Sequence, residues 1–179
     1  MPVLVHLNGP PGVGKSTLSA LRADRNPGTL NLDVDALHLL IGGWRDPRTD
    51  TWRLVWPLVH AMAAAHLDGG HDVVLPQYHA RLDEVAVLED LARAHGAAFR
   101  EVVLLTDRDT TVARFDRRGR ETADPWIRHH HGLLGADRLG TMHDDLLALV
   151  GLLPDAVVVP SAEGAVEETY ALLAAALRA

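Results

Sequence analysis

A glycine-rich segment near the start of the chain constrains its fold more than any other feature. Residues 9–16 read Gly-Pro-Pro-Gly-Val-Gly-Lys-Ser and follow the short apolar run of residues 3–7. The segment fits the pattern G-x-x-x-x-G-K-[ST] without a gap, and residues 15–25 have a helical pattern. A strand, a glycine-rich loop and a helix in this order predict a phosphate-binding loop at the start of an α/β fold.

Each part of this loop has a predicted role in binding a nucleoside triphosphate. The glycines let backbone N–H groups turn inward around the phosphates, and the helix N-terminus adds positive potential. Lys15 is the only lysine of the chain and should bridge the outer phosphates, while Ser16 should bind Mg²⁺. A glycine- and proline-rich turn without a ligand is the alternative. We predict that ATP and Mg²⁺ bind here, with nucleotide contacts from Gly9, Pro10, Pro11, Gly12, Val13, Gly14, Lys15, Ser16 and Thr17.

Strand-like and helix-like segments alternate along the rest of the chain. Further strands are predicted at residues 29–33, 71–76, 99–105 and 156–159, and further helices at 35–40, 51–67, 81–95, 110–118, 126–150 and 165–177. In the helix of residues 51–67, Trp52 and Trp56 belong to an apolar stripe, and Pro57 should kink this helix or delay its start. Residues 119–125 should form a mobile loop, and a glycine at 132, 135 or 140 should divide the helix that follows. The alternation predicts a parallel sheet covered on both faces, with ligands beyond the carboxyl ends of its strands.

Length and composition limit the other classes of protein. The 179 residues suit one domain, residues 1–179, and the chain has no apolar run long enough to span a membrane. A net charge of −7 argues against binding to long nucleic acids. The absence of cysteine excludes thiolate metal sites, and a strand that begins at Pro2 leaves no room for a signal peptide. We expect a cytoplasmic location.

Two carboxylates stand at the end of the second predicted strand. In a phosphoryl transferase, one such carboxylate can accept the proton of the acceptor hydroxyl, and the other can hold Mg²⁺. We predict Asp35 as the base and Asp33 as the metal ligand. The alternative is that Asp35 only caps the helix that follows it.

Polar side chains also follow the third predicted strand. Gln77, Tyr78, His79 and Arg81 stand there, yet residues 75–77 carry no acid for a metal. Either Asp33 takes over that duty, or hydrolysis and transfer are impaired. Contact with a substrate and a solvated loop explain these side chains about equally well.

The densest cationic cluster lies after the fourth predicted strand and comprises Arg114, Arg117, Arg118 and Arg120. Arginines in a closing lid can stack on adenine and stabilise charge on the transferring phosphate. We predict catalytic and nucleotide-binding roles for Arg114 and Arg118; a solvated helix face is the alternative.

Three consecutive histidines, residues 129–131, raise the hypothesis of a zinc site. Consecutive side chains on a helix point in different directions, however, and no cysteine or H-E-x-x-H spacing accompanies them. Substrate contact through Arg128, Trp126 or His129 is the stronger hypothesis, and an exposed face is the plainest interpretation.

Taken together, these residues resemble the small P-loop kinases of the shikimate-kinase and nucleoside-monophosphate-kinase type. The resemblance implies a three-layer α/β/α fold with a five-stranded parallel sheet in the order 2-3-1-4-5. It also implies a small lid at about residues 118–128, acceptor-binding helices at about residues 35–68, and adenine contacts from Pro160 and Ser161 after the last strand.

Two shorter segments resemble antibiotic-related P-loop proteins. Residues 34–37 and 120–123 are similar to segments of chloramphenicol phosphotransferase, and residues 74–76 with the arginine-rich stretch ending near Trp126 are similar to tunicamycin-resistance ATPases. These likenesses imply transfer of phosphate from ATP to a hydroxyl of a small molecule such as a metabolite, nucleoside or antibiotic. The alternatives are a resistance protein that sequesters a nucleotide-like drug and a kinase that acts on nucleic-acid ends. Either a monomer or a homodimer is compatible with the sequence.

Overall fold

The computed structural model describes residues 1–178, without the side chain of residue 130. Its centre is a five-stranded parallel sheet in the order β2-β3-β1-β4-β5, which confirms the predicted fold class. The strands are β1 (Val3–Asn8), β2 (Leu30–Asn31), β3 (Val73–Pro76), β4 (Ala98–Leu105) and β5 (Val157–Pro160). The helices are α1 (Lys15–Arg25), α2 (Val34–His38), α3 (Thr51–Asp68), α4 (Leu82–Ala94), α5 (Arg108–Glu121), α6 (Pro125–Leu133), α7 (Ala136–Val150) and α8 (Val166–Ala176).

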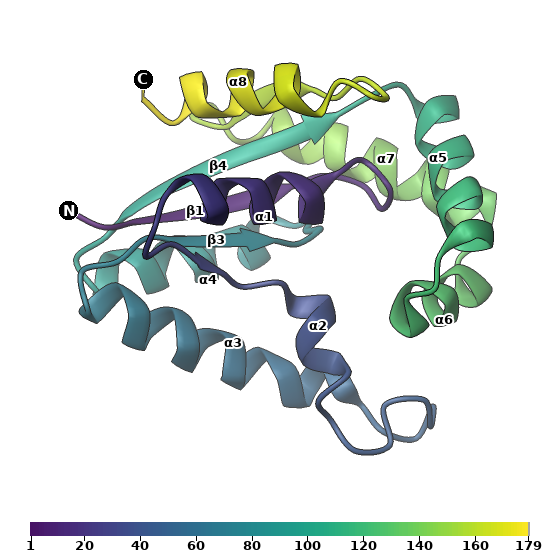
Figure 1. Ribbon diagram of the computed structural model, residues 1–179, viewed down its shortest axis with the longest axis horizontal. Helices are drawn as coiled ribbons and strands as arrows, with labels where there is room; N and C mark the ends of the chain where they lie inside the picture. Colours follow the sequence, from purple (N-terminus) through teal and green to yellow (C-terminus); the bar gives the residue numbers. More distant parts are fainter. Residues whose placement is uncertain (179) are drawn as a thin grey trace.

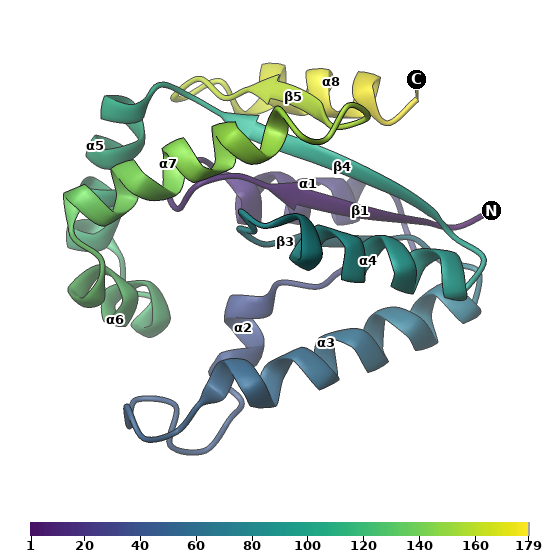
Figure 2. The same cartoon turned by 180° about the vertical axis from the view of Figure 1, so that it is seen from behind.

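Helices cover both faces of the sheet. Helices α1 and α8 lie on one face, and α4 and α7 lie on the other (Figures 1 and 2). Alternate residues of each buried strand pack against opposite layers: Val5 and Leu7 contact the α1–α8 side, and Leu4 contacts the α3–α4 side. The central strands are buried on both faces, so they are apolar almost throughout.

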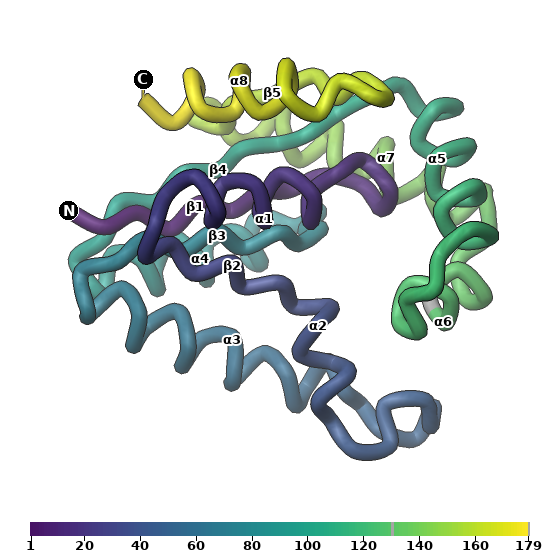
Figure 3. The backbone as a smooth tube through the Cα atoms, in the orientation of Figure 1, coloured from purple at the N-terminus to yellow at the C-terminus, as the bar shows by residue number. Residues whose placement is uncertain are grey.

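The connections of the sheet place the predicted site at one end of the molecule. The phosphate-binding loop, α2 and the residues after β3 all lie at the carboxyl ends of parallel strands. The backbone trace in Figure 3 puts α5 and α6 at this end and both termini at the other. Within residues 1–178, no helix is both long and apolar enough to cross a membrane.

Three local predictions are corrected by the structure. The loop predicted at residues 119–125 is shorter and comprises residues 122–124, because α5 continues to Glu121 and the carboxylate of Asp124 caps α6 by accepting from Trp126 N–H at 2.8 Å. Of the two alternatives for Pro57, a delayed start of the helix is wrong, because α3 begins at Thr51, where Asp50 caps it by accepting from Arg53 N–H at 3.2 Å. Strand β2 is shorter than residues 29–33, because the chain turns at Asp33 into α2. The predicted break in residues 126–150 falls at Gly135, the N-cap of α7.

Candidate functional site

The phosphate-binding loop is shaped by two glycines that no other residue could replace without displacing the backbone. Gly9 has φ 151° and Gly12 has φ 84°, in the region that L side chains rarely adopt. A Cβ on Gly9 would lie 2.8 Å from the carbonyl oxygen of Leu104, and one on Gly12 would lie 3.1 Å from the backbone nitrogen of Phe115. The loop therefore sits directly against β4 and α5. No side chain caps α1, so its first N–H groups can receive an anion.

Lys15 holds the loop closed through its ammonium group. Its Nζ donates hydrogen bonds to the carbonyl oxygens of Gly9, at 2.7 Å, and Pro10, at 3.1 Å. Burial lowers the pKa of Lys15 from 10.5 to about 8, against the raising effect of Asp35, and Arg118 lowers it further. A bound phosphate would favour the charged ammonium and raise this pKa again.

This low pKa predicts a pH dependence of nucleotide binding. If the bound phosphates raise the pKa of Lys15, nucleotide binding is accompanied by uptake of a proton at any pH between the pKa of Lys15 in the free protein and its pKa in the complex. The affinity for Mg-ATP should therefore be level below pH 8 and fall by up to about tenfold per pH unit above it. Isothermal titration calorimetry across this range measures the effect. In Lys15→Arg the guanidinium stays charged, so the affinity of this variant for Mg-ATP should not change with pH over the same range. An equal decline of affinity in the wild type and the variant would contradict the prediction.

Ser16 and Asp33 offer oxygen ligands for a divalent cation. Burial raises the pKa of Asp33 and the charge of Asp35 adds to this, whereas a hydrogen bond with the Ser16 hydroxyl lowers it. A hydroxyl and a carboxylate side by side are hard oxygen donors of the kind that Mg²⁺ prefers. The two residues therefore fit the predicted ion.

Asp33, not Asp35, caps α2. The carboxylate of Asp33 accepts a hydrogen bond of 3.1 Å from the backbone N–H of Asp35. The alternative that assigned the cap to Asp35 is thus wrong, because Asp35 contributes only its backbone. Its carboxylate stays available for chemistry and lines the larger cavity of the site.

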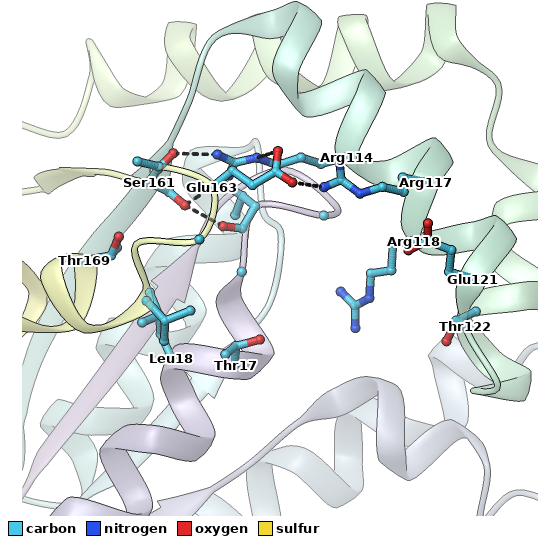
Figure 4. A pocket seen from close by; sticks show the side chains of 16 residues that line it. Thr17, Leu18, Arg114, Arg117, Arg118, Glu121, Thr122, Ser161, Glu163 and Thr169 are labelled. Atoms are coloured by element: carbon cyan, nitrogen blue, oxygen red, sulfur yellow. Dashed lines mark hydrogen bonds and ion pairs between the residues drawn. The ribbon is translucent and has the colours of Figure 1, made fainter.

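One cavity, of about 380 Å³, lies between the phosphate-binding loop, α5 and the segment after β5. Figure 4 shows Arg114 reaching Ser161 across it. The Arg114 guanidinium donates to the Ser161 hydroxyl at 3.3 Å and to the Ser161 carbonyl oxygen at 3.2 Å, and the Ser161 hydroxyl donates to the carbonyl oxygen of Val13 at 2.8 Å. Glu163 forms ion pairs with Arg114, at 3.9 Å, and with Arg117. Arg114 thus joins α5, the last loop and the phosphate-binding loop around this cavity.

A second cavity, of about 570 Å³, adjoins the first. Gly12, Gly14 and Arg118 line both. Figure 4 shows the Arg118 side chain standing apart from the Arg114–Ser161 contacts and extending away from them. The second cavity is also lined by Lys15, Ser16, Asp35, Gln77, Tyr78 and His79. The structure therefore places Lys15, Ser16 and the predicted base Asp35 around one cavity, with Arg118 at the junction with the first cavity.

A buried polar network supports the residues that line these cavities. His6 Nε2 lies 3.0 Å from the carbonyl oxygen of Gln77 and must donate to it, and Nδ1 lies 2.5 Å from Glu101 Oε2. Asn8 donates to Glu101 Oε1 at 2.9 Å and to the carbonyl oxygen of His79 at 2.9 Å. The Asn8 side-chain oxygen accepts from the N–H groups of His79, at 3.0 Å, and Gly9, at 2.8 Å. The network thereby ties the phosphate-binding loop to the residues after β3.

The remaining predicted residues lie apart from the two cavities. The exposed side chain of Arg81 pairs with Asp83. Arg128, also exposed, donates to the carbonyl oxygen of Thr122 at 3.0 Å. Pro160 ends β5 at the surface, and the structure does not bring it to the nucleotide cavity with Ser161.

Of the three consecutive histidines, the side chains of His129 and His131 are described. Among the described side chains, no group of three His, Cys, Asp or Glu residues is arranged to hold a metal ion. His129 packs edge-on against Trp44, with ring centroids 5.6 Å apart, and His131 lies beside Phe115 at 5.3 Å. The side chain of His130 is outside the described part of the chain.

Sequence reasoning named Trp126 as a candidate substrate contact but missed the rest of the aromatic wall of the second cavity. Trp52 and Trp56 come from α3, Trp126 from α6 and Phe115 from α5. The two α3 residues are four positions apart and share a helix face, a spacing that also describes an ordinary core stripe. His6, Asn8 and Glu101 were missed as well; a polar residue within an otherwise apolar buried strand was the available signal.

Comparisons with known proteins agree with this fold. A gluconokinase from Sinorhizobium meliloti 1021 has a TM-score of 0.62 at 21% identity, and a tunicamycin resistance protein from Deinococcus radiodurans has 0.64 at 19%; for each, 99% of this chain and 96% of the other are covered. A chain of the Pnkp1/Rnl/Hen1 RNA repair complex has a TM-score of 0.73 at 18% identity over 86% of this chain, which spans only 47% of that protein. No curated protein matches significantly by sequence.

These structural neighbours establish the fold, and a family profile establishes the membership. The neighbours confirm the predicted resemblance to small P-loop kinases. The profile of the AAA domain family matches residues 4–133, which include the phosphate-binding loop, α2, α3, α4 and α5. The chain belongs to the AAA domain family and has the fold of a small P-loop kinase.

Proposed function

We propose that this protein transfers the γ-phosphate of Mg-ATP to a hydroxyl of a small molecule bound in the 570 Å³ cavity. The observation that carries the proposal is the shared junction of the two cavities. Arg118, Gly12 and Gly14 line both cavities there, and Lys15 and Asp35 line the larger one. A nucleotide in the smaller cavity would present its terminal phosphate to an acceptor in the larger one.

The residues of the junction suit an in-line phosphoryl transfer. Asp35 orients the acceptor hydroxyl and takes its proton as the oxygen bonds to the γ-phosphorus and the bond to the bridging oxygen of ADP breaks. Lys15 and the N–H groups of the loop hold the phosphates, and Arg118 stabilises the charge on the transferring group. Mg²⁺ bound at Ser16 and Asp33 would supply further charge neutralisation. Positioning and electrostatics provide most of the rate gain in such a site.

Acceptor-dependent release of ADP tests the proposal. The purified protein with Mg-ATP should release ADP, above its basal rate, with at least one member of a broad panel of hydroxylated metabolites, nucleosides and antibiotics. The phosphorylated product should appear in equal amount by mass spectrometry. ATP binding without acceptor-dependent release across the whole panel would contradict transfer.

The second candidate function is sequestration of a drug with little or no transfer. One observation favours it: β3 ends in Pro76 and Gln77, so the carboxylate that many P-loop enzymes carry at this place is absent. Under this alternative, a drug would bind without acceptor-dependent ADP release, and resistance would not depend on the Asp35 carboxylate.

A further inference from the structure

All four tryptophans of the chain gather around the larger cavity. Trp52, Trp56 and Trp126 line it, and Trp44 lies beside Trp126 with ring centroids 5.8 Å apart. Resting on the phosphotransferase function, we propose that the acceptor is a ring compound with a flat apolar face and no carboxylate or phosphate of its own. The tryptophan rings would bind the face, and Asp35 would meet the hydroxyl.

The aromatic side chains form two groups that bound the cavity. Trp126 stacks on His38 and Trp52 meets the same ring edge-on, each with its ring centroid 4.2 Å from that of His38, so α3 and α6 are joined through this ring of α2. Trp56 lies beside His79 at 5.2 Å, next to the residues after β3. Rings held by such contacts are pre-organised and lose little freedom when a flat ligand packs on them. A volume of about 570 Å³ is within the range of pockets that hold a whole small molecule.

The charges of the cavity oppose an acidic acceptor. Under the proposed function, the phosphates of the nucleotide would engage Lys15 and Arg118. Among the described residues, the other charged groups lining the cavity are the carboxylates of Asp35 and Glu84 and the guanidinium of Arg138. This remainder is net negative, and the triphosphate beside it adds more negative charge. A carboxylate or phosphate on the acceptor would therefore have only the Arg138 guanidinium to pair with, and the two carboxylates of the cavity and the triphosphate would repel it.

Three polar side chains that line the cavity after β3 are neutral. Burial, aided by the charge of His6, lowers the pKa of His79 to about 3, so its imidazole carries no charge near neutral pH. Burial also raises the pKa of Tyr78 to about 12, and its hydroxyl donates to the carbonyl oxygen of Met142 at 3.0 Å. With the amide of Gln77, these groups offer hydrogen bonds to uncharged heteroatoms of a ring compound.

A matched pair of probes tests the inference. 4-(Hydroxymethyl)benzamide and 4-(hydroxymethyl)benzoate share ring, hydroxyl and size but differ by one negative charge. Each is titrated into the protein with Mg²⁺ and a saturating β,γ-imido analogue of ATP while tryptophan fluorescence is recorded. The benzamide should change the fluorescence and bind about tenfold or more tightly than the benzoate. Gluconate serves as an acidic probe without a ring face and should bind no better than the benzoate.

Two variants link the result to the proposed residues. Trp56→Leu should weaken benzamide binding about fivefold or more and leave the affinity for the ATP analogue unchanged. Glu84→Gln should reduce the difference in affinity between the two probes several-fold, because it removes one negative charge from the cavity. Glutamine can keep the cap that Glu84 makes with the N–H groups of Ala80 and Arg81, so the fold should be preserved. Leu54→Ala, on an exposed part of α3, is the control and should change neither affinity.

The outcomes separate this inference from the phosphotransferase function. Tighter binding of benzoate or gluconate than of benzamide, or no response to benzamide up to its solubility limit, would overturn it. Acceptor-dependent ADP release with an acidic substrate would also overturn it while upholding phosphoryl transfer. Benzamide binding that requires Trp56, in a protein without acceptor-dependent ADP release, would uphold the ring site and count against the transferase.

Discussion

Replacing Lys15 with methionine should lower the rate of acceptor-dependent ADP release by about 10²–10³-fold and weaken binding of Mg-ATP. The ammonium group lies within the phosphate-binding loop, on the carbonyl oxygens of Gly9 and Pro10, and it is the side-chain cation that the motif places on the outer phosphates. Methionine has a similar length but no charge. Steady-state kinetics and calorimetry with the β,γ-imido analogue measure the two effects.

The stability of the same variant serves as its control. The pKa of Lys15 is about 8 in the folded protein against 10.5 for a free lysine. The folded state is therefore penalised below pH 8, and the penalty disappears as the pH rises toward the unfolded value. At pH 7 methionine removes this penalty, so the melting temperature should not fall. A large drop in melting temperature would mean that the lost activity reflects damaged folding.

Replacing Asp35 with asparagine should lower the turnover number by about 10²–10⁴-fold, because the amide cannot take the proton of the acceptor hydroxyl. Binding of nucleotide and acceptor should change little. The cap of α2 is preserved, since it uses only the backbone N–H of Asp35. Single-turnover kinetics with an acceptor found in the panel, together with calorimetry, separate the chemical step from binding.

The same substitution decides between the two candidate functions. Asp24→Asn, at an exposed position of α1, is the matched control and should leave turnover unchanged. A wild-type protein that binds a drug but does not transfer phosphate to it, with resistance unaffected by Asp35→Asn, would support sequestration. A loss of both transfer and resistance in the variant would support the kinase.

The sequence alone predicted the phosphate-binding loop between β1 and α1. The positions predicted to hold phosphate are contiguous, residues 9–16, and they would act mostly through backbone groups whose direction is set by the glycines and by the start of α1. The apolar strands could also be predicted from the sequence, because both of their faces are buried and their residues are therefore apolar almost throughout. Helix boundaries were predicted less well: Pro57 suggested a later start of α3 and residues 119–125 a longer loop, and the caps from Asp50 and Asp124 set the observed boundaries.

Only the tertiary structure shows how the larger cavity, the proposed acceptor half of the site, is formed. The aromatic wall joins Trp52 and Trp56 with Trp126, far along the chain, and the support beneath it joins Asn8 with Glu101. The tertiary structure also places the two predicted arginines differently. Arg114 binds Ser161, and Arg118 lies at the junction of the cavities. The physical reason is that a local motif carries its geometry in its own backbone, whereas a cavity is formed by side chains whose proximity depends on how distant helices pack.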